Sequence, residues 1–547
     1  MTGSSGAMLI NLSVAIGLLV GLLLLPRLTR SWRWSPDRLV AFLDSPWAPL
    51  AAGLLTCVIV RSVWGSLAEP GIIHDERAYL LQAEIFARGR WTAAVPPIPA
   101  FFEQMHVFVE PAVFAKYPPA HAITLVPGIW LGLPGLMPTL LAGVAGALTF
   151  WLARRLSHVW VALLTWMLWT TAPATLIWAT SYLSESTSLV MWLAAASATA
   201  LWLESRKQRY LVCVAVALAW GFEARPLTML ALAAPLGFVI VRRFIQSGGW
   251  RAAALPMLLG AVLLGLGPVW NHQTLGHWTI DPYPQYSRMY FPFDKPGFGV
   301  DPAPPLRQVP PELTPIDAWA RDVHRSYVPA AVPVALAERM AAVLIAYSAG
   351  WRLIIGAFLL GALLRARGAA RMSIAASLSL FIAYLVFAHP SGWVVYYVEL
   401  LPALHFLAAD RLVRVLDRSK EQSASDSFRL SPFLARVSAA AALLLLPFCL
   451  SDLVLVRAGV DRRNQFNRQA DQAIRTAPLN SIVFVRYAAA QNPHRAITRN
   501  EADLGSARTW VVYDRGAENA RLLDVAPDRT PYRLNASTFQ LEPLSDP

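Results

Sequence analysis

The sequence predicts an all-α membrane protein with about 12 transmembrane helices, followed by a small α/β domain outside the membrane. Of its 547 residues, 56% are hydrophobic and only 15% are charged, whereas soluble domains carry about 25% charged residues. Apolar runs such as 48–63, 161–178 and 439–456 approach the roughly 20 residues that cross a bilayer. After residue 457 the sequence turns polar. These observations exclude a protein that is soluble throughout.

The charge and the cysteines fit the same class. The net charge of +13 does not call for a nucleic-acid partner, because arginines commonly fix the short cytoplasmic loops of membrane proteins. The three cysteines lie in apolar runs, so we expect neither a disulfide framework nor a cysteine metal site. The run 8–25 is followed, not preceded, by arginines, which favours a transmembrane helix over a signal peptide.

The chain divides into three parts by composition. We expect an N-terminal helix with a basic cytoplasmic loop (1–46), a transmembrane domain (47–457) and a C-terminal α/β domain (458–547). The expected spans lie near residues 8–26, 47–66, 136–153, 159–179, 185–203, 209–222, 227–241, 252–270, 335–363, 372–388, 396–409 and 433–457. If the arginine-rich connections face the cytoplasm, residues 119–153 must cross the membrane a net odd number of times, so we expect 120–134 to form a short half-inserted or interfacial helix.

Every other connection then faces outward. These connections hold carboxylates, histidines and tyrosines, and they are 67–120, 181–185, 223–226, 271–334, 389–397 and the tail after 457. Basic loops on one side and a convergent polar surface on the other favour an enzyme or receptor with its site at the outer face.

Two of the outer segments have a readable local pattern. The loop 271–334 is rich in Pro, Tyr and Phe without a clear helical or strand period, so we expect a lid over the site. In the tail, 481–487 and 509–513 predict strands and 516–524 predicts a helix. The tail would bind an acceptor or cap the outer loops.

The first outer loop holds the strongest candidate residues. Apolar spacing over 75–88 predicts a helix with Asp75 and Glu76 in its first turn, where negative charge complements the helix dipole. One interpretation is that these acids only start the helix. The other is that they form a site, because carboxylates at a membrane are costly unless they have a function. Two adjacent carboxylates also raise each other's proton affinity, which suits a base. Lys116, near the loop's end, either snorkels to the interface or binds an anion.

These residues resemble the C-type (GT-C) superfamily of integral-membrane glycosyltransferases. The resemblance is to the bacterial branch related to protein O-mannosyltransferases, lipid A aminoarabinose transferases and lipopolysaccharide sugar transferases with lipid-linked donors. It covers roughly residues 45–415. The residues that carry it are Asp75-Glu76 with Tyr79, Lys116-Tyr117-Pro118-Pro119, Pro282-Tyr283-Pro284, Tyr290-Phe291-Pro292 and Tyr396-Tyr397-Val398-Glu399.

The resemblance implies an enzyme of the bacterial inner membrane with its active site facing the periplasm. It would move a sugar from a polyprenyl-phosphate donor to a hydroxyl of a lipid, glycan or protein acceptor. Asp75 would be the base, and Glu76 would orient it, bind the acceptor or hold a cation. The implied substrate-binding residues are His74, Tyr79, Tyr117, Glu185, Tyr283, Tyr396 and Glu399.

A lipid-phosphate leaving group also implies cations near the outer membrane surface. We expect Lys116, Arg225 and Arg288 in this role, with Arg339 as a further candidate. For Arg225 the alternative is an internal ion pair with Glu223.

The sequence is also compatible with other functional classes of protein. The sequence has no glycine-rich phosphate loop and no zinc-protease motif. No cofactor is expected, although a divalent cation near His74, Asp75 and Glu76 stays open. A secondary transporter would account for the many spans but predicts internal repeats. A non-catalytic scaffold built around the tail is another alternative, and an O-antigen ligase or polymerase is open within the enzyme class.

Overall fold

The computed structural model describes residues 36–544, except 70, 72, 348–367, 423–429, 489–493, 495 and 496. The expected span at 8–26 and residues 348–363 of the expected span at 335–363 lie outside the described residues. The helices are α2 (Pro36–Asp44), α3 (Trp47–Trp64), α4 (His74–Ala87), α5 (Pro119–Trp130), α6 (Leu136–Leu156), α7 (Val159–Thr171), α8 (Pro173–Trp178), α9 (Glu185–Ser205), α10 (Gln208–Phe222), α11 (Pro226–Ser247), α12 (Ala254–Leu264), α13 (Leu266–Leu275), α14 (Pro282–Tyr290), α15 (Thr314–Ser326), α16 (Val332–Tyr347), α18 (Ala369–Ala383), α19 (Leu401–Gln422), α20 (Leu430–Thr476) and α21 (Asn519–Val525).

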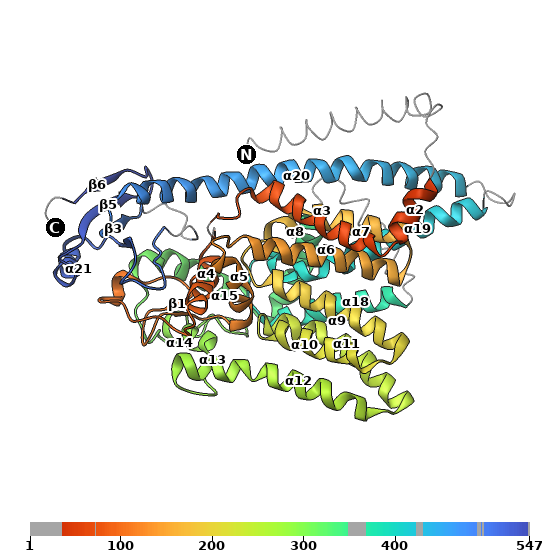
Figure 1. Cartoon of the computed structure of the whole chain (residues 1–547), viewed down its shortest axis with the longest axis horizontal. Coiled ribbons are helices and arrows are strands. Elements are labelled where there is room, and N and C mark those ends of the chain that lie inside the picture. The colour runs from red at the N-terminus through yellow and green to blue at the C-terminus, as the bar shows by residue number, and fades with distance from the viewer. Residues whose placement is uncertain are drawn as a thin grey trace, which may run out of the picture.

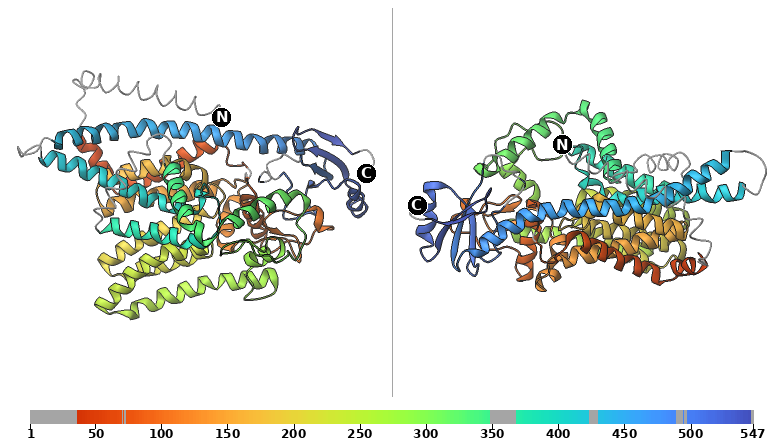
Figure 2. Two further views of the ribbon diagram at one scale, coloured as in Figure 1. Left: turned by 180° about the vertical axis from the view of Figure 1, so that it is seen from behind. Right: turned by 90° about the horizontal axis from the view of Figure 1, so that it is seen from above.

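The chain is a multi-pass helical membrane protein with a small sheet domain at one end (Figure 1). Within the described residues, six helices or joined helices are long and apolar enough to cross a membrane, and a seventh passes if a pair bent by 79° counts as one span. The expected number of about 12 spans is therefore not reached in this part of the chain. The joined helix over Trp250–Leu275 lies at the edge of the bundle opposite α20 (Figures 1 and 2). Only 6% of its most apolar window is buried, as suits a lipid-facing helix.

Proline breaks one of the expected spans. The sequence predicted a single helix over 159–179, but Ala172 is extended and the chain restarts at Pro173 as the short helix α8. Proline is tolerated in a first turn but not in a helix interior, because it lacks the N–H and its ring clashes with the preceding turn. By contrast, the expected short helix at 120–134 is present as α5 (Pro119–Trp130), and its half-insertion stays a prediction. Its 12 residues are too few to span about 30 Å of hydrocarbon.

The long outer loop is more regular than the sequence indicated. We expected no helical period in 271–334, yet this segment contains α14 and α15. Prolines at or near the first turn begin both helices, and Asp281 caps α14 by accepting the Tyr283 N–H at 2.7 Å. The prolines of this segment therefore lie where helices begin, and they do not indicate a chain without secondary structure.

Helix α20 joins the membrane bundle to the C-terminal domain. It runs 47 residues along one side of the bundle to the sheet, as Figures 1 and 2 show. The predicted domain boundary at residue 458 falls inside this helix, because charged residues after Arg457 change the composition without breaking the helical period. A single helix therefore connects the bundle to the sheet.

The C-terminal domain is built on a four-stranded sheet. Its strands, in the order β4-β3-β5-β6, are β3 (Ser481–Arg486), β4 (Thr509–Tyr513), β5 (Thr530–Asn535) and β6 (Leu541–Pro543). β3 pairs in parallel with β4 and β5, and β6 is antiparallel to β5. The two predicted strands and the predicted helix are confirmed, as β3, β4 and η8 (Gly516–Glu518) with α21. The sequence analysis did not identify β5 and β6.

The sheet domain packs against the first outer loop. The ring of Phe101 lies 6.3 Å from that of Phe484 in β3, and the ring of Phe102 lies 5.4 Å from that of Trp510 in β4. Arg515 Nη2 donates a hydrogen bond to the Ala100 carbonyl at 2.7 Å. The hydrophobic core of the domain thus includes side chains from a segment almost 400 positions earlier, and it fixes that loop.

Substituting Phe101 by alanine should loosen this domain contact. Phe101 is 1% exposed, and truncating a buried phenylalanine costs about 3–5 kcal/mol. We expect the tail of the variant to be cut faster by protease in intact membranes, measured by loss of a C-terminal tag. Phe42→Ala, at a position 47% exposed on α2, is the matched control. Equal cleavage rates in the two variants would contradict the contact.

Candidate active site

A polar cavity of about 140 Å³ opens among the outer connections. Its walls come from the first outer loop, the long loop 271–334, the turn before α19 and the C-terminal domain. The residues used below are His74, Asp75, His106, Lys116, Tyr117, Tyr283, Asp294, Trp319, His324, His389, Trp393, Tyr396 and His494. The polar connections that the sequence placed on one face therefore do meet at one cavity.

Asp75 lies in the first turn of α4, as predicted. The helix begins after Ile73, whose N–H donates a hydrogen bond to Glu76 Oε2 at 3.2 Å. The other Glu76 oxygen accepts the backbone N–H of Tyr182 at 3.3 Å, and Glu76 is 3% exposed. Glu76 thus ties the start of the helix to the segment before α9, while Asp75 lines the cavity. The two adjacent acids have separate surroundings.

Asp75 is held as a carboxylate. The Tyr117 hydroxyl donates a hydrogen bond to Asp75 Oδ1 at 2.5 Å, and His106 Nε2 lies 3.6 Å from the same oxygen. Burial raises the pKa of Asp75, but His106, the Tyr117 hydroxyl and Lys116 outweigh it and leave the pKa below its ordinary value. The expectation that Glu76 would raise the proton affinity of Asp75 is wrong, because hydrogen bonding and positive charge dominate around this group.

A short hairpin brings His106 and Lys116 together. Strands β1 (Val107–Phe108) and β2 (Phe114–Ala115) pair so that Val107 faces Ala115, and the Lys116 N–H donates to the His106 carbonyl at 2.9 Å. His106 has a φ of 68°, a left-handed conformation uncommon outside glycine. Burial and the nearby Lys116 lower the pKa of His106 to about 3, while Asp75 opposes that shift.

Lys116 is a buried cation facing the cavity. It is 2% exposed, and its Nζ lies 4.3 Å from the ring centroid of Tyr283 and 5.2 Å from that of Tyr286. The nearest carboxylate is Asp294 Oδ2 at 4.0 Å, and the other Asp294 oxygen lies 3.8 Å from His324 Nε2. Burial lowers the pKa of Lys116, and the two cavity carboxylates oppose that shift. A snorkelling interface role does not fit this position, because the ammonium is turned away from bulk water.

Arg225 belongs to a second cluster behind the cavity wall. Its guanidinium pairs with Glu185 and lies 3.4 Å from Glu399 Oε1. Glu399 also accepts a hydrogen bond from Ser188 Oγ at 2.6 Å. The alternative pair with Glu223 is wrong. Two carboxylates thus already engage Arg225.

Aromatic rings connect this cluster to the cavity. Tyr79 stacks on Tyr117 with ring centroids 4.5 Å apart, and the Arg225 guanidinium lies 5.6 Å from the Tyr396 ring centroid. Of the predicted site residues, Asp75, Lys116, Tyr117, Tyr283, Tyr396 and His74 line the cavity, whereas Tyr79, Glu185, Arg225 and Glu399 lie behind it.

The two remaining predicted arginines do not face the cavity. Arg288 is exposed on α14 and is not among the described residues that line the cavity. Arg339 is 1% exposed, and its guanidinium donates to the backbone carbonyls of Tyr384, Phe387 and His389 at 3.0 to 3.2 Å. Arg339 therefore stabilises the turn that carries His389, and both of its terminal nitrogens are engaged there.

The side chains present do not form a metal site. Among the residues that the structure describes, no group of three or more His, Cys, Asp or Glu side chains is arranged to hold a metal ion. The divalent cation left open by the sequence therefore has no ligand set in this part of the chain.

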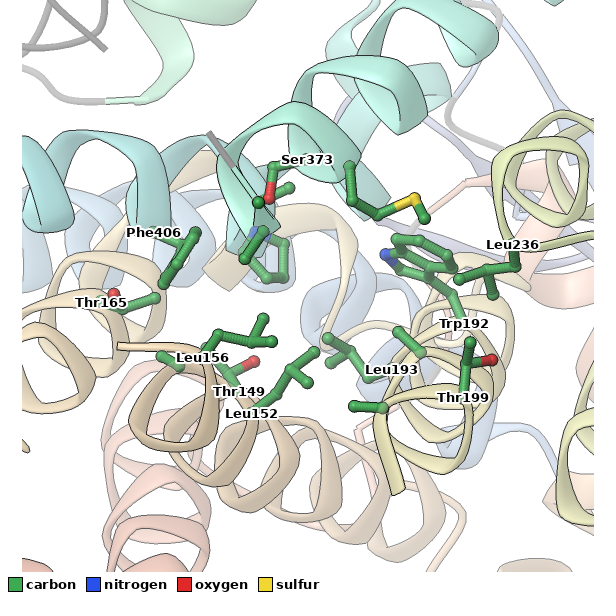
Figure 3. A pocket seen from close by; sticks show the side chains of 18 of the residues that line it. Thr149, Leu152, Leu156, Thr165, Trp192, Leu193, Thr199, Leu236, Ser373 and Phe406 are labelled. Carbon is green, nitrogen blue, oxygen red and sulfur yellow. The ribbon is translucent and has the colours of Figure 1, made fainter. Parts of the chain in front are cut away.

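A larger cavity lies within the bundle. It has a volume of about 340 Å³ and is enclosed by α6, α7, α9, α11, α18 and α19. Figure 3 shows Trp192 and Leu236 on one side of it and Phe406 on the other. Its lining residues are apolar or carry hydroxyls, and none of those described is titratable. The chemistry of the chain is therefore concentrated in the smaller, polar cavity.

Comparison with solved structures finds proteins whose backbones follow a path similar to that of this chain. One is ArnT from Cupriavidus metallidurans bound to undecaprenyl phosphate, with 15% identity, a TM-score of 0.48 and coverage of 90% of this chain and 91% of that chain. Another is the archaeal oligosaccharyltransferase AglB from Archaeoglobus fulgidus in complex with an inhibitory peptide and a dolichol-phosphate, with 12% identity, a TM-score of 0.40 and coverage of 81% and 63%.

No family model and no curated protein sequence matches the chain. The matched structures are of the class that the sequence resemblance named. Similarity at this level transfers no residue role, substrate or partner to this chain.

Several cavity residues were not identified from the sequence. His106, Asp294 and His324 lie far apart in the sequence, and only the hairpin, the chain after α14 and α15 bring them to Asp75 and Lys116. The one feature of the sequence that could have indicated these three residues as site residues was their position in the predicted outer connections.

Substituting Tyr117 by phenylalanine should change stability in a pH-dependent way. The hydroxyl favours ionised Asp75, so its contribution is present above about pH 4 and is lost as the pH falls through the depressed pKa of Asp75. We expect the wild type to exceed Tyr117→Phe in thermal-unfolding midpoint at pH 6–8, by an amount equivalent to about 1.5–3 kcal/mol, and the gap to narrow below pH 4.

The control for this measurement is Tyr283→Phe, because the Tyr283 ring lies on the same wall but approaches Lys116. A gap between wild type and Tyr117→Phe that is independent of pH would contradict the assignment of the hydroxyl to ionised Asp75.

Proposed function

We propose that this protein is a membrane glycosyltransferase. It would move a sugar from a polyprenyl-phosphate donor to a hydroxyl of a lipid, glycan or protein acceptor, at the periplasmic face of a bacterial inner membrane. The observation that carries the proposal is the pairing, in one outer cavity, of an ionised carboxylate with a buried ammonium. Sugar transfer from a phosphate needs these two groups, one for the acceptor proton and one for the leaving charge.

Asp75 would act as the base of the reaction. In the proposed step the acceptor oxygen bonds to the anomeric carbon of the sugar while the bond from that carbon to the phosphate oxygen breaks. The acceptor proton goes to Asp75, and the electron pair of the broken bond stays on the phosphate. The hydrogen bond from Tyr117 holds one Asp75 oxygen, so the second oxygen is the one available to the acceptor.

Lys116 would stabilise the phosphate that leaves. The donor phosphodiester carries one negative charge and the phosphate product up to two, so an adjacent cation favours the product side of the step. The Lys116 ammonium lies against aromatic rings and is 2% exposed, and low polarity strengthens its attraction for an anion. Its one close carboxylate, at 4.0 Å, leaves room for a further negative group.

The decisive experiment is sugar transfer by Asp75→Asn. Asparagine keeps the shape and still accepts the Tyr117 hydrogen bond but takes no proton, so we expect kcat to fall about 10²–10⁴-fold. Transfer would be measured in membranes supplied with radiolabelled polyprenyl-phosphate sugars at equal expression. Asp322→Asn, at an exposed position of α15, is the control. Wild-type transfer that survives in Asp75→Asn would exclude Asp75 as base, and no wild-type transfer from any donor would overturn the proposal.

The role of Lys116 is tested against Arg288. Lys116→Ala should raise the KM for the lipid-phosphate donor at least tenfold, because it removes the only cavity-lining Lys or Arg among the described residues. Arg288→Ala should stay within twofold of wild type, since Arg288 is exposed on α14. The measurement is initial transfer rate against donor concentration for both variants. Equal effects would mean that surface charge, rather than the buried lysine, attracts the donor.

A further inference from the structure

Three aromatic side chains from distant segments meet on one wall of the cavity. The Trp319 ring of α15 lies 5.2 Å from that of Trp393, which directly precedes the short helix η7 (Val394–Leu400). His494 of the C-terminal domain lies 5.5 Å from Trp319 and 6.4 Å from Trp393, nearly edge-on to both. All three line the same cavity as Asp75 and Lys116. The two indoles are tilted by 36°, so they form one continuous surface.

This surface is open to the cavity, unlike the buried tryptophans of the bundle. Trp319 and Trp393 are each 37% exposed, whereas Trp169 and Trp270 are 0% and 2% exposed. Leaving large apolar rings in contact with water forgoes roughly 25 cal/mol per Å² of stabilisation. A membrane-interface anchor is a poor alternative, because anchors face the lipid headgroups and these rings line the polar cavity. The geometry therefore favours a ligand that covers them.

We propose that Trp319, Trp393 and His494 form a subsite that binds a sugar ring beside Asp75. The inference rests on the proposed transferase function and deepens it. One face of a sugar ring presents C–H groups with a slight positive charge, and the face of an aromatic ring is negative. Stacking of these faces is favourable and tolerates the sugar's outward hydroxyls. Nothing in the sequence analysis assigned a role to these three residues.

His494 gives the C-terminal domain a place in the site. Burial lowers the pKa of His494, so its ring is neutral at pH 7 and suits an aromatic contact more than an ion pair. The domain is held at the cavity by the Phe101–Phe484 and Phe102–Trp510 contacts, and Arg515 lies 3.6 Å from Glu312, just before α15. The same domain thus contacts the helix that carries Trp319 and supplies the third ring.

Binding measurements separate this subsite from the phosphate site. The probes are polyprenyl phosphate alone and polyprenyl phosphate carrying each of several single sugars, titrated into the purified full-length protein in nanodiscs. For at least one sugar, the wild type should bind the sugar-bearing lipid about tenfold more tightly than the bare lipid, equivalent to about 1.4 kcal/mol. Trp319→Ala with Trp393→Ala should abolish that difference and leave the affinity for bare polyprenyl phosphate within twofold. Trp47→Ala, 67% exposed at the start of α3, is the control.

Steady-state transfer then shows whether the subsite binds the sugar of the donor or a sugar of the acceptor. If the subsite holds the donor sugar, Trp393→Ala raises the donor KM and Trp393→Phe restores most of it, because phenylalanine keeps an aromatic face. If it holds a sugar of the acceptor, the acceptor KM rises in the same variants and the sugar does not change lipid binding. Wild-type transfer with both KM values unchanged in Trp319→Ala and Trp393→Ala would overturn the subsite. Failure of the wild type to bind the bare lipid or transfer any sugar would instead overturn the proposed function.

Discussion

The outer end of this protein depends on one buried positive charge. Lys116 is almost fully removed from water, and such a charge is costly unless nearby groups compensate for it. The compensation comes from the rings of Tyr117, Tyr283 and Tyr286 and from the carboxylate of Asp294. These side chains belong to the first outer loop (67–120) and to the loop 271–334. The cost of burying Lys116 is therefore offset only when both segments close on each other, and this closure forms the cavity.

The same logic explains the position of Asp75. Burial raises the pKa of its carboxylate, yet that pKa stays low because of His106, the hydrogen bond from Tyr117 and the nearby Lys116. Tyr117 follows Lys116 in the chain, so one dipeptide serves both charges. The hairpin of β1 and β2 fixes that dipeptide beside His106. A tight backbone structure in a loop thus sets the geometry between a carboxylate and an ammonium, which a flexible loop would not hold.

The sequence predicted what depends on local pattern. Helix α4, the short α5, strands β3 and β4 and the outward convergence of polar segments follow from apolar spacing and charge. It did not predict what depends on tertiary contact. The partners of Arg225 are Glu185 and Glu399, respectively 40 and 174 positions away, and local spacing indicated Glu223. Asp294 and His324 join the site because α14 and α15 fold back onto the first outer loop. Neither helix was predicted, because the proline-rich segment shows no clear helical period in the sequence.

The two buried cations of this region have different surroundings. Arg225 is held by two carboxylates, through an ion pair with Glu185 and a 3.4 Å approach to Glu399 Oε1, and it is not among the described residues that line the cavity. Lys116 has a single carboxylate in its vicinity within 4.0 Å and faces the cavity. Lys116 is therefore the one of these two cations that an anion entering the cavity would reach, while Glu185 and Glu399 keep Arg225 in place behind Tyr79 and Tyr396.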